Sequence, residues 1–521
     1  MITRQRPPVF LRVAVQQSVV ANTTSARRVA RLTSGSGRRG RVLATTVELP
    51  LWLVLIVGVL SILAALDHLL LPSARWVMRR RLNRAIEELN TRLKLRIQPF
   101  KLAKRQSLID QLVFDPDVIH EIEIYAKTHN ITRTVAQDIA RSYAREIVPS
   151  FSAYAYFGIG ARLARWVCTM LYRVRLGYMD EDALKTVDPD SSVIFVINHR
   201  SNMDYVLVTY MASSSSALSY AVGEWARVWL LQSLIRSMGA YFVRRDSHDP
   251  LYRKVLARYV SMAVAGGLAQ AVFPEGGLTR DGKLQKPKLG LIGYMVAGFD
   301  AKAARDAVFV PVGINYDRVL EDRLQLGVLA AKAEGGRSRY RFKARIFLAA
   351  FIRHLFLAVR GRWFRFGYAC VGFGAPVSLR QYVTERGIDF RTLDQASRFA
   401  EVERLAGMLM AKVGAVVPVL PVALVATALR QANAPLSMLE LKARVLALAQ
   451  RLAAAGCHVH IPRGDQDYAI EVGLRMLRLR HIVSDDDGLY RINPADLPVV
   501  DYYANSIAHL LVEAATAQAA E

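Results

Sequence analysis

The stretch that decides the fold is Val-Ile-Phe-Val-Ile at residues 193–197, followed directly by Asn-His-Arg-Ser-Asn-Met-Asp-Tyr at residues 198–205. A β-branched run that ends in cap-forming residues predicts a strand, a sharp turn and the start of a helix. His199 is then expected at the carboxyl end of a buried strand, and Asp204 in the first turn of the helix. Two residues at this spacing would face different ways on one continuous helix, because five residues turn roughly 500°. A turn between them lets the carboxylate reach the imidazole.

A carboxylate beside a histidine indicates proton-transfer chemistry. An imidazole that a carboxylate holds in one tautomer is a general base, able to take a proton from a hydroxyl. The alternative is that His199 is only a hydrogen-bonded turn residue, because a His-x4-Asp pair also arises by chance. The rest of the chain has to decide between these interpretations.

The chain is long enough for two or three domains, and its positive charge is uneven. It has 521 residues and a formal net charge of +26, a balance that attracts nucleic acid, anionic lipid or anionic substrates. Residues 1–48 lack the apolar periodicity of a folded unit, so a disordered Arg-rich tail is expected, with a transit peptide as the alternative. Before Glu48 there is no Asp or Glu, and nine arginines occur: Arg4, Arg6, Arg12, Arg27, Arg28, Arg31, Arg38, Arg39 and Arg41.

Residues 49–71 are a candidate membrane anchor. Leu49 to Leu66 is a run of eighteen residues without a charge, which just meets the length of a membrane span. A buried soluble helix, or a helix lying in the membrane interface, is the alternative. Arginines flank the run on both sides, so charge gives no orientation.

The three cysteines do not form a metal-binding or disulfide pattern. Cys168, Cys370 and Cys457 are far apart and include no CxxC pair, which suits a reducing compartment. No metal site is expected.

The remaining chain divides by pattern into three regions. Residues 72–170 have a long amphipathic helical pattern, with a helix-start signal at residues 115–117; residues 171–385 alternate short β-branched runs with helical stretches; residues 386–521 are mainly helical. The alternation predicts an α/β layer structure in the middle region. The expected strands are Val193–Ile197, Gly239–Val243, Ala271–Phe273, Val308–Val312 and Ala369–Phe373.

Two further segments have more than one interpretation. Residues 413–429 are apolar and uncharged, but Pro418 and Pro421 fall inside, so an internal loop and helix are expected rather than a second span. Residues 341–365 mix arginines with large apolar residues, which suits either a helix on an anionic membrane or an ordinary core helix with a basic face.

Three more blocks lie at the ends of expected strands, and the first two carry charged residues. They are Gly-Ala-Tyr-Phe-Val-Arg-Arg at 239–245, Phe-Pro-Glu-Gly-Gly-Leu-Thr-Arg-Asp-Gly-Lys at 273–283, and Val-Pro-Val-Gly-Ile at 310–314. Open α/β sheets bind their ligands at the carboxyl ends of the strands. Glycines there allow close backbone approach, and Arg and Lys can contact a phosphate.

In this order the four blocks resemble the glycerolipid acyltransferase superfamily, and most closely the long bacterial glycerol-3-phosphate 1-O-acyltransferases. Ala-Arg-Glu-Ile at 144–147, Pro-Val-Ala-Leu-Val-Ala-Thr-Ala-Leu at 421–429 and Tyr-Tyr-Ala-Asn-Ser-Ile-Ala-His at 502–509 also look like segments of that family. The resemblance covers roughly residues 105–512. It implies a mixed-sheet acyltransferase core flanked by helices, with an N-terminal membrane segment and helical N- and C-terminal regions.

The resemblance also implies the activity and the site. An acyl group would pass from acyl-CoA or acyl-carrier protein to the sn-1 hydroxyl of glycerol 3-phosphate, without a cofactor or covalent intermediate, giving lysophosphatidate. The site would lie at the cell inner membrane, with the catalytic domain on the cytoplasmic face and no nucleic-acid partner. In it, His199 is the base, Asp204 orients it, and the expected substrate-binding residues are Arg244, Arg245, Glu275, Gly276, Gly277, Arg280, Lys283 and Pro311, the last associated with the acyl donor.

One departure from the family pattern bears on the acceptor. The third block of the family usually reads Glu-Gly-Gly-Arg-Ser-Arg, but the first Arg position is Leu278 here. A literal copy at residues 334–339 follows no expected strand and is interpreted as coincidence. Ser201 is interpreted as a helix cap, since no Gly-x-Ser-x-Gly elbow surrounds it. The competing hypotheses are another acceptor, such as lysophosphatidate or dihydroxyacetone phosphate, and a non-enzymatic membrane-tethered basic binding protein.

Overall fold

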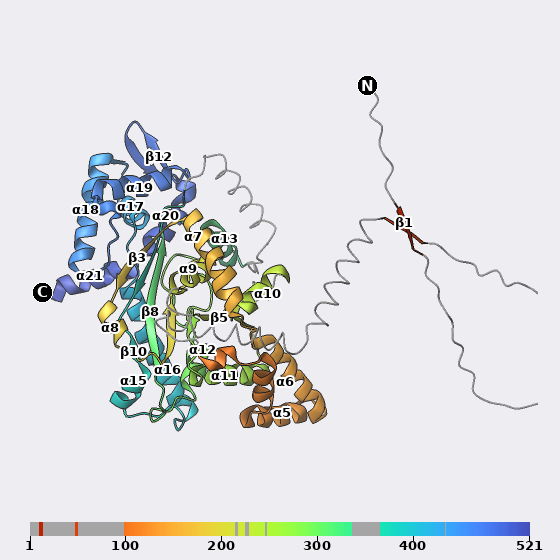
Figure 1. Ribbon diagram of the computed structural model, residues 1–521. Helices are drawn as coiled ribbons and strands as arrows, with labels where there is room; N and C mark the ends of the chain where they lie inside the picture. Colours follow the sequence, from red (N-terminus) through yellow and green to blue (C-terminus); the bar gives the residue numbers. More distant parts are fainter. Residues whose placement is uncertain are drawn as a thin grey trace, which may run out of the picture. The chain divides into compact units, whose positions relative to one another are not determined.

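The structure is a computed structural model that describes residues 10–13, 47–50, 98–213, 217–223, 229–244, 247–335, 365–432 and 434–520 (Figure 1). The chain forms two units, residues 1–87 and 88–521. In the first, strands β1 (Phe10–Val13) and β2 (Val47–Pro50) pair in antiparallel register. The expected membrane anchor lies outside the described residues apart from Leu49 and Pro50 in β2. Of the helices that the structure describes, none combines the length and the apolar character of a membrane span.

A mixed sheet of eight strands forms the centre of the second unit. Its order is β3-β9-β8-β4-β7-β5-β6, with β10 pairing to β8. Strands β4, β5, β6, β7 and β8 run parallel, whereas β9 and β10 run antiparallel to β8, so the expected mixed α/β core is confirmed. The strands are β3 (Arg173–Met179), β4 (Ser192–Ile197), β5 (Ser219–Gly223), β6 (Tyr241–Val243), β7 (Gln270–Val272), β8 (Ala307–Tyr316), β9 (Tyr368–Phe373) and β10 (Val377–Ser378).

Strand β4 is buried on both faces, which explains its unbroken apolar run. Val193 and Ile197 belong to one hydrophobic core, and Ile194 and Val196 to the other. The first core includes residues of α7 (Ala161–Leu171), α9 (Met203–Ala212) and the C-terminal helices. The second includes residues of α4 (Arg105–Val113), α5 (Pro116–Thr128), α6 (Arg133–Ile147), α11 (Pro250–Ala265), α12 (Gly290–Val296), α15 (Leu379–Arg386) and α16 (Gln395–Ala415).

Several helix boundaries follow the sequence signals directly. Helix α5 begins at Pro116, and the side chain of Asp115 accepts a hydrogen bond from the backbone N–H of Asp117, as the helix-start signal predicts. Residues 413–429 form the expected loop and helix: α16 ends at Ala415, and α17 (Pro421–Arg430) is buried in the first core. Other helices before residue 335 are α3 (Pro99–Leu102), the π-helix Tyr154–Gly160, α8 (Glu181–Lys185), α10 (Trp229–Ser237) and α13 (Asp322–Ala333).

The C-terminal region is mainly helical, drawn in blue in Figure 1, and its first residues pack against strands β3, β9 and β8. A Cβ on Gly313 of β8 would lie 2.4 Å from the carbonyl oxygen of Val416, so the chain passes too close for a side chain. After α17 come β11 (Leu436–Ser437), α18 (Met438–Ala454), α19 (Gln466–Arg478), β12 (Val483–Asp486), β13 (Leu489–Ile492), α20 (Leu497–Asn505) and α21 (Ala508–Ala520). The segment 341–365 lies outside the described residues, apart from Arg365.

Candidate active site

The loop between β4 and α9 brings His199 and Asp204 together as the sequence predicts. Strand β4 ends at Ile197 and α9 begins at Met203, so the expected turn separates the two side chains. Nδ1 of His199 lies 2.9 Å from Oδ2 of Asp204. Both side chains are buried, with exposed fractions of 1% and 0%. The pair therefore sits in an environment that water does not screen.

The carboxylate of Asp204 is fixed from four directions. Besides the ring of His199, Oδ2 accepts hydrogen bonds from the backbone N–H groups of Arg200 (2.7 Å) and Ser201 (3.0 Å). Oδ1 accepts one from the hydroxyl of Tyr316 at the end of β8 (2.7 Å). An oxygen that already accepts from two N–H groups has no proton to offer the ring, so Nδ1 of His199 is the donor.

This tautomer leaves Nε2 of His199 as a proton acceptor. Nε2 is buried and has no hydrogen-bond partner among the described residues. The ring is held by Phe273 and Tyr205, whose ring centroids lie 4.4 Å and 5.4 Å from its own. A buried basic nitrogen without a partner has the chemistry of a general base that is ready for a hydroxyl.

The Pro-Glu-Gly loop holds the backbone of His199 on both sides. The N–H of His199 donates to Oε1 of Glu275 (3.1 Å), and the N–H of Thr279 donates to the carbonyl of His199 (3.0 Å). Burial raises the pKa of Glu275 to about 8, although the N–H of His199 and the nearby guanidinium of Arg200 oppose that shift. Gly276 has φ of +68°, and a Cβ there would lie 2.5 Å from Cδ of Lys288, so the loop requires glycine at this position.

Arg200 joins the loop to three other parts of the fold. Its buried guanidinium donates to the carbonyls of Ile314 (3.2 Å), Gly282 (3.0 Å) and Ser506 (2.9 Å). These carbonyls belong to β8, to the Pro-Glu-Gly loop and to the C-terminal region. The C-terminal region therefore helps to position the residue next to His199, a role that its sequence pattern did not predict.

Glu321 is a second buried carboxylate that sequence reasoning missed. Its carboxylate accepts from the hydroxyl of Ser201 (2.7 Å) and from the side-chain amide of Asn202 (3.0 Å). Burial raises its pKa to about 7. Ser201 also accepts from the N–H of Met203 (3.1 Å), but the N-cap residue of α9 is Asn202, so Ser201 lies one residue before the position expected for it. No local signal points to Glu321, because it lies more than a hundred residues after the loop that it holds.

The basic residues expected to bind phosphate lie in different surroundings. Arg244 makes two hydrogen bonds to Glu146, with Nε 3.0 Å from Oε1 and Nη2 2.6 Å from Oε2, and this partner raises its pKa. Arg280 and Lys283 are exposed on the Pro-Glu-Gly loop, and no described acidic side chain forms an ion pair with either. Arg245 lies outside the described residues.

The remaining expected site residues, Gly277 and Pro311, have no polar side chain. Gly277 is half-buried in the loop, one residue after Gly276. Pro311 is buried in β8, and its carbonyl accepts from the N–H of Gly374 (2.9 Å). Pro311 lies between the stretch of β8 that pairs with β9 and the stretch that pairs with β10. A backbone N–H is therefore not needed for pairing at this position, and proline is tolerated.

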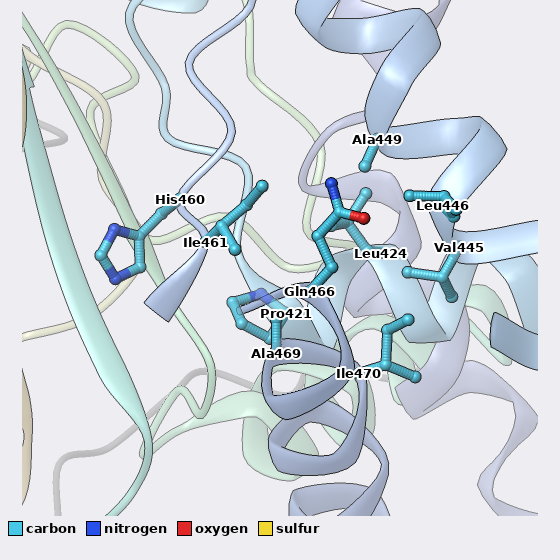
Figure 2. A pocket seen from close by; sticks show the side chains of 10 residues that line it. All are labelled: Pro421, Leu424, Val445, Leu446, Ala449, His460, Ile461, Gln466, Ala469 and Ile470. Carbon is cyan, nitrogen blue, oxygen red and sulfur yellow. The ribbon is translucent and has the colours of Figure 1, made fainter. Parts of the chain in front are cut away.

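Two hollows in the described part of the chain lie away from His199. One is a small apolar pocket between α17, α18 and α19, lined by side chains that include Leu424, Val445 and Ile470 (Figure 2). The other lies at the amino-terminal edge of the sheet. Because the His199 side chain is only 1% exposed, a ligand atom reaches Nε2 only after neighbouring groups move.

The sequence matches two family models. Residues 179–315 match a model described as acyltransferase, and residues 352–520 match one described as glycerol-3-phosphate acyltransferase C-terminal region. The glycerol-3-phosphate acyltransferase of Pseudomonas savastanoi pv. phaseolicola is 28% identical over 425 residues, which cover 78% of this chain and 49% of that protein. The Pseudomonas entomophila protein of the same name is 27% identical over 429 residues, with the same coverage.

Among solved structures, the 1-acyl-sn-glycerophosphate acyltransferase of Thermotoga maritima covers 49% of this chain and 77% of its own. Its identity is 16% and its TM-score 0.26. The chain spans about half the length of the curated relatives that it matches.

Proposed function

We propose that this chain, which belongs to the glycerolipid acyltransferase superfamily, transfers a fatty acyl group from a thioester donor to the sn-1 hydroxyl of glycerol 3-phosphate. The product is lysophosphatidate. The observation that carries the proposal is the buried Nε2 of His199, which has no partner among the described residues while Asp204 holds Nδ1 at 2.9 Å.

In the proposed reaction, Nε2 of His199 takes the proton of the sn-1 hydroxyl as its oxygen attacks the thioester carbonyl. The new C–O bond forms, the C–S bond breaks, and the thiolate leaves with the proton that the imidazolium returns. Asp204 stabilises the imidazolium through its negative charge. A base of this kind contributes ~10²–10⁴ in rate, equivalent to about 3–5 kcal/mol of the barrier. The step needs no cofactor beyond the thioester, supplied as acyl-CoA or acyl-carrier protein.

The phosphate of the acceptor is proposed to bind on the Pro-Glu-Gly loop. Arg280 and Lys283 are exposed there, and the same loop holds the backbone of His199 through Glu275 and Thr279. With its phosphate bound to these cations, glycerol 3-phosphate would have its hydroxyl groups near the loop that carries His199. Arg244 and Arg245 remain candidates, with Arg244 required to share its guanidinium with Glu146. Pro311 remains the residue proposed for the side of the acyl donor.

One observation bears on which acceptor is used. Leu278 stands where the third sequence block of the family usually has its first arginine, so the loop has one cation fewer than the family pattern. Lysophosphatidate or dihydroxyacetone phosphate is therefore the competing acceptor.

An activity matrix distinguishes the acceptors. The purified chain is assayed with glycerol 3-phosphate, lysophosphatidate and dihydroxyacetone phosphate, each with acyl-CoA and with acyl-carrier protein, and His199→Ala is the control. Product that depends on glycerol 3-phosphate and is lost in the control supports the proposal. Product with another acceptor alone would replace it.

The proposed location is the cell inner membrane, with the catalytic domain on the cytoplasmic face. The uncharged run Leu49–Leu66 and the net charge of +26 support it. Fractionation of cells that express the full chain, or the chain without residues 1–71, tests it. Recovery of both in the soluble fraction would contradict it.

A further inference from the structure

A polar hollow lies at the opposite edge of the sheet from His199. His199 follows the carboxyl end of β4, whereas the hollow is lined by Ser219, the first residue of the parallel strand β5, and by Leu268, two residues before β7. Its empty space is about 740 Å³, part of it open to solvent. The acyl transfer proposed above uses none of the side chains that line this hollow.

Lys101 brings a buried amine to this hollow. Its side chain lines the hollow, and the residue is only 8% exposed. Nζ donates to the carbonyl of Ala217 (2.5 Å) and lies 4.5 Å from the ring centroid of Phe151. No described carboxylate forms an ion pair with it, and burial holds its pKa well below that of a lysine in water. A buried ammonium without an anion is unfavourable, so an anion in the hollow would stabilise its charged form.

Ser219 adds an unpartnered hydroxyl. The residue is 1% exposed, and its Oγ has no hydrogen-bond partner among the described residues. Gly239, which has φ of +92°, explains how Ser219 and Lys101 come together. A Cβ on Gly239 would lie 3.2 Å both from Oγ of Ser219 and from Cε of Lys101. Because glycine has no Cβ, both groups can lie close to the backbone of Gly239 and to each other. The first glycine of the second sequence block thus lets Ser219 and Lys101 approach each other.

The amino terminus of α4 contributes a third group of donors. Ala103, Lys104 and Arg105 line the hollow, and Arg105 is the first residue of the nine-residue helix. No side chain caps this terminus and its first turn contains no acidic residue. The first N–H groups of a helix have no partner within it and favour an anion.

From these three groups we propose that the hollow binds a phosphate-sized oxyanion, held by Lys101, Ser219 and the amino terminus of α4. The donors come from separate elements, which suits a tetrahedral anion with several oxygens. The anion can belong to a soluble phosphate compound or to a lipid headgroup, since both present the same oxygens. The proposal is independent of the acyl transfer, because it concerns binding alone.

Equilibrium dialysis of the full chain against inorganic phosphate tests the proposal. We expect Lys101→Met to bind one phosphate fewer per chain than the wild type, while Lys185→Met, an exposed lysine outside the hollow, binds as the wild type does. Phosphate at the acyl-transfer site would remain in all three proteins. Equal stoichiometry and affinity in Lys101→Met and the wild type would overturn the proposal.

Ser219→Ala provides a second measurement that does not depend on loss of a charge. Removal of an unpartnered buried hydroxyl should leave the melting temperature in phosphate-free buffer equal or higher. The rise in melting temperature on adding phosphate should be smaller than in the wild type. An equal rise would count against the site.

Vesicles identify the source of the anion. Phosphatidylcholine vesicles with and without phosphatidic acid are added to the dialysis. The quantity measured is the bound phosphate that the wild type holds and Lys101→Met does not. Displacement only by the anionic vesicles supports a lipid headgroup; retention supports a soluble phosphate compound.

Discussion

Replacing Asp204 by Asn removes the charge beside His199 while leaving the geometry in place. Arg200 and Ser201 donate to Oδ2 from backbone N–H groups, which cannot turn around. The amide oxygen of an asparagine must therefore occupy the Oδ2 position, and its NH₂ group faces the hydroxyl of Tyr316, which can accept. The ring of His199 keeps an acceptor at Nδ1, so Nε2 stays unprotonated.

The expected loss follows from the change in charge alone. A hydrogen bond to a charged group contributes about 1.5–3 kcal/mol, and one between neutral groups about 0.5–1.5 kcal/mol. The imidazolium that forms in the transition state therefore loses about 1–2 kcal/mol, and kcat falls ~5–30-fold. If the amide could rotate and offer its NH₂ to the ring, the tautomer would reverse and the loss would approach ~10⁴.

Steady-state kinetics with saturating donor and varied glycerol 3-phosphate measure this effect. The KM for the acceptor should stay close to that of the wild type, because Asp204 is not proposed to touch it. Asp394→Asn is the matched control: this exposed aspartate also accepts from two backbone N–H groups, at 2.9 and 3.0 Å, but caps α16. A kcat of Asp204→Asn within twofold of the wild type would refute the role of the carboxylate.

Three further substitutions test the surroundings of His199. Glu275→Gln should flatten the dependence of stability on pH. In the wild type, the pKa of Glu275 is about 8 in the folded state and 4.5 ordinarily, so the free energy of unfolding falls as pH rises from 4.5 to 8. Urea unfolding at several pH values measures this slope, and equal slopes in the variant and the wild type would contradict the prediction. Gly282→Ala places a Cβ 1.9 Å from a backbone carbonyl oxygen of α20, so it should lower the melting temperature and kcat. Gly488→Ala is the control, because Gly488 has a similar φ (+81° against +84°) and no atom lies within 4 Å of its Cβ position. Equal effects of the two substitutions would exclude the close contact. Ser201→Ala should reduce stability by about 1–3 kcal/mol while turnover continues, because it removes a hydroxyl that donates to the buried carboxylate of Glu321 and accepts from the N–H of Met203, and not a nucleophile; complete inactivation of a folded variant would contradict this role.

The central strands and the His199–Asp204 pair could be predicted because their signals are local. All five expected strand positions hold strands, since buried strands leave short apolar runs in the sequence. The turn between Ile197 and Met203 was readable from its cap-forming residues. The dyad needs only this turn.

The elements that were missed lack such signals. Strand β3 alternates arginine with apolar residues, and it lies at the edge of the sheet, where one side needs no apolar run. Glu321 and Glu146 contact their partners across about a hundred residues, and nothing near them in the sequence indicates these contacts. Arg244 was expected at phosphate from its block alone, whereas its bidentate partner Glu146 appears only in three dimensions.

The rate of glycerol-3-phosphate acylation by His199→Ala, with and without added imidazole, tests the role of the ring most directly. Loss of the general base should lower kcat by ~10²–10⁴, and imidazole that enters the space left by the ring should restore part of the rate. A variant that turns over at a rate close to that of the wild type without imidazole would contradict proton transfer through Nε2.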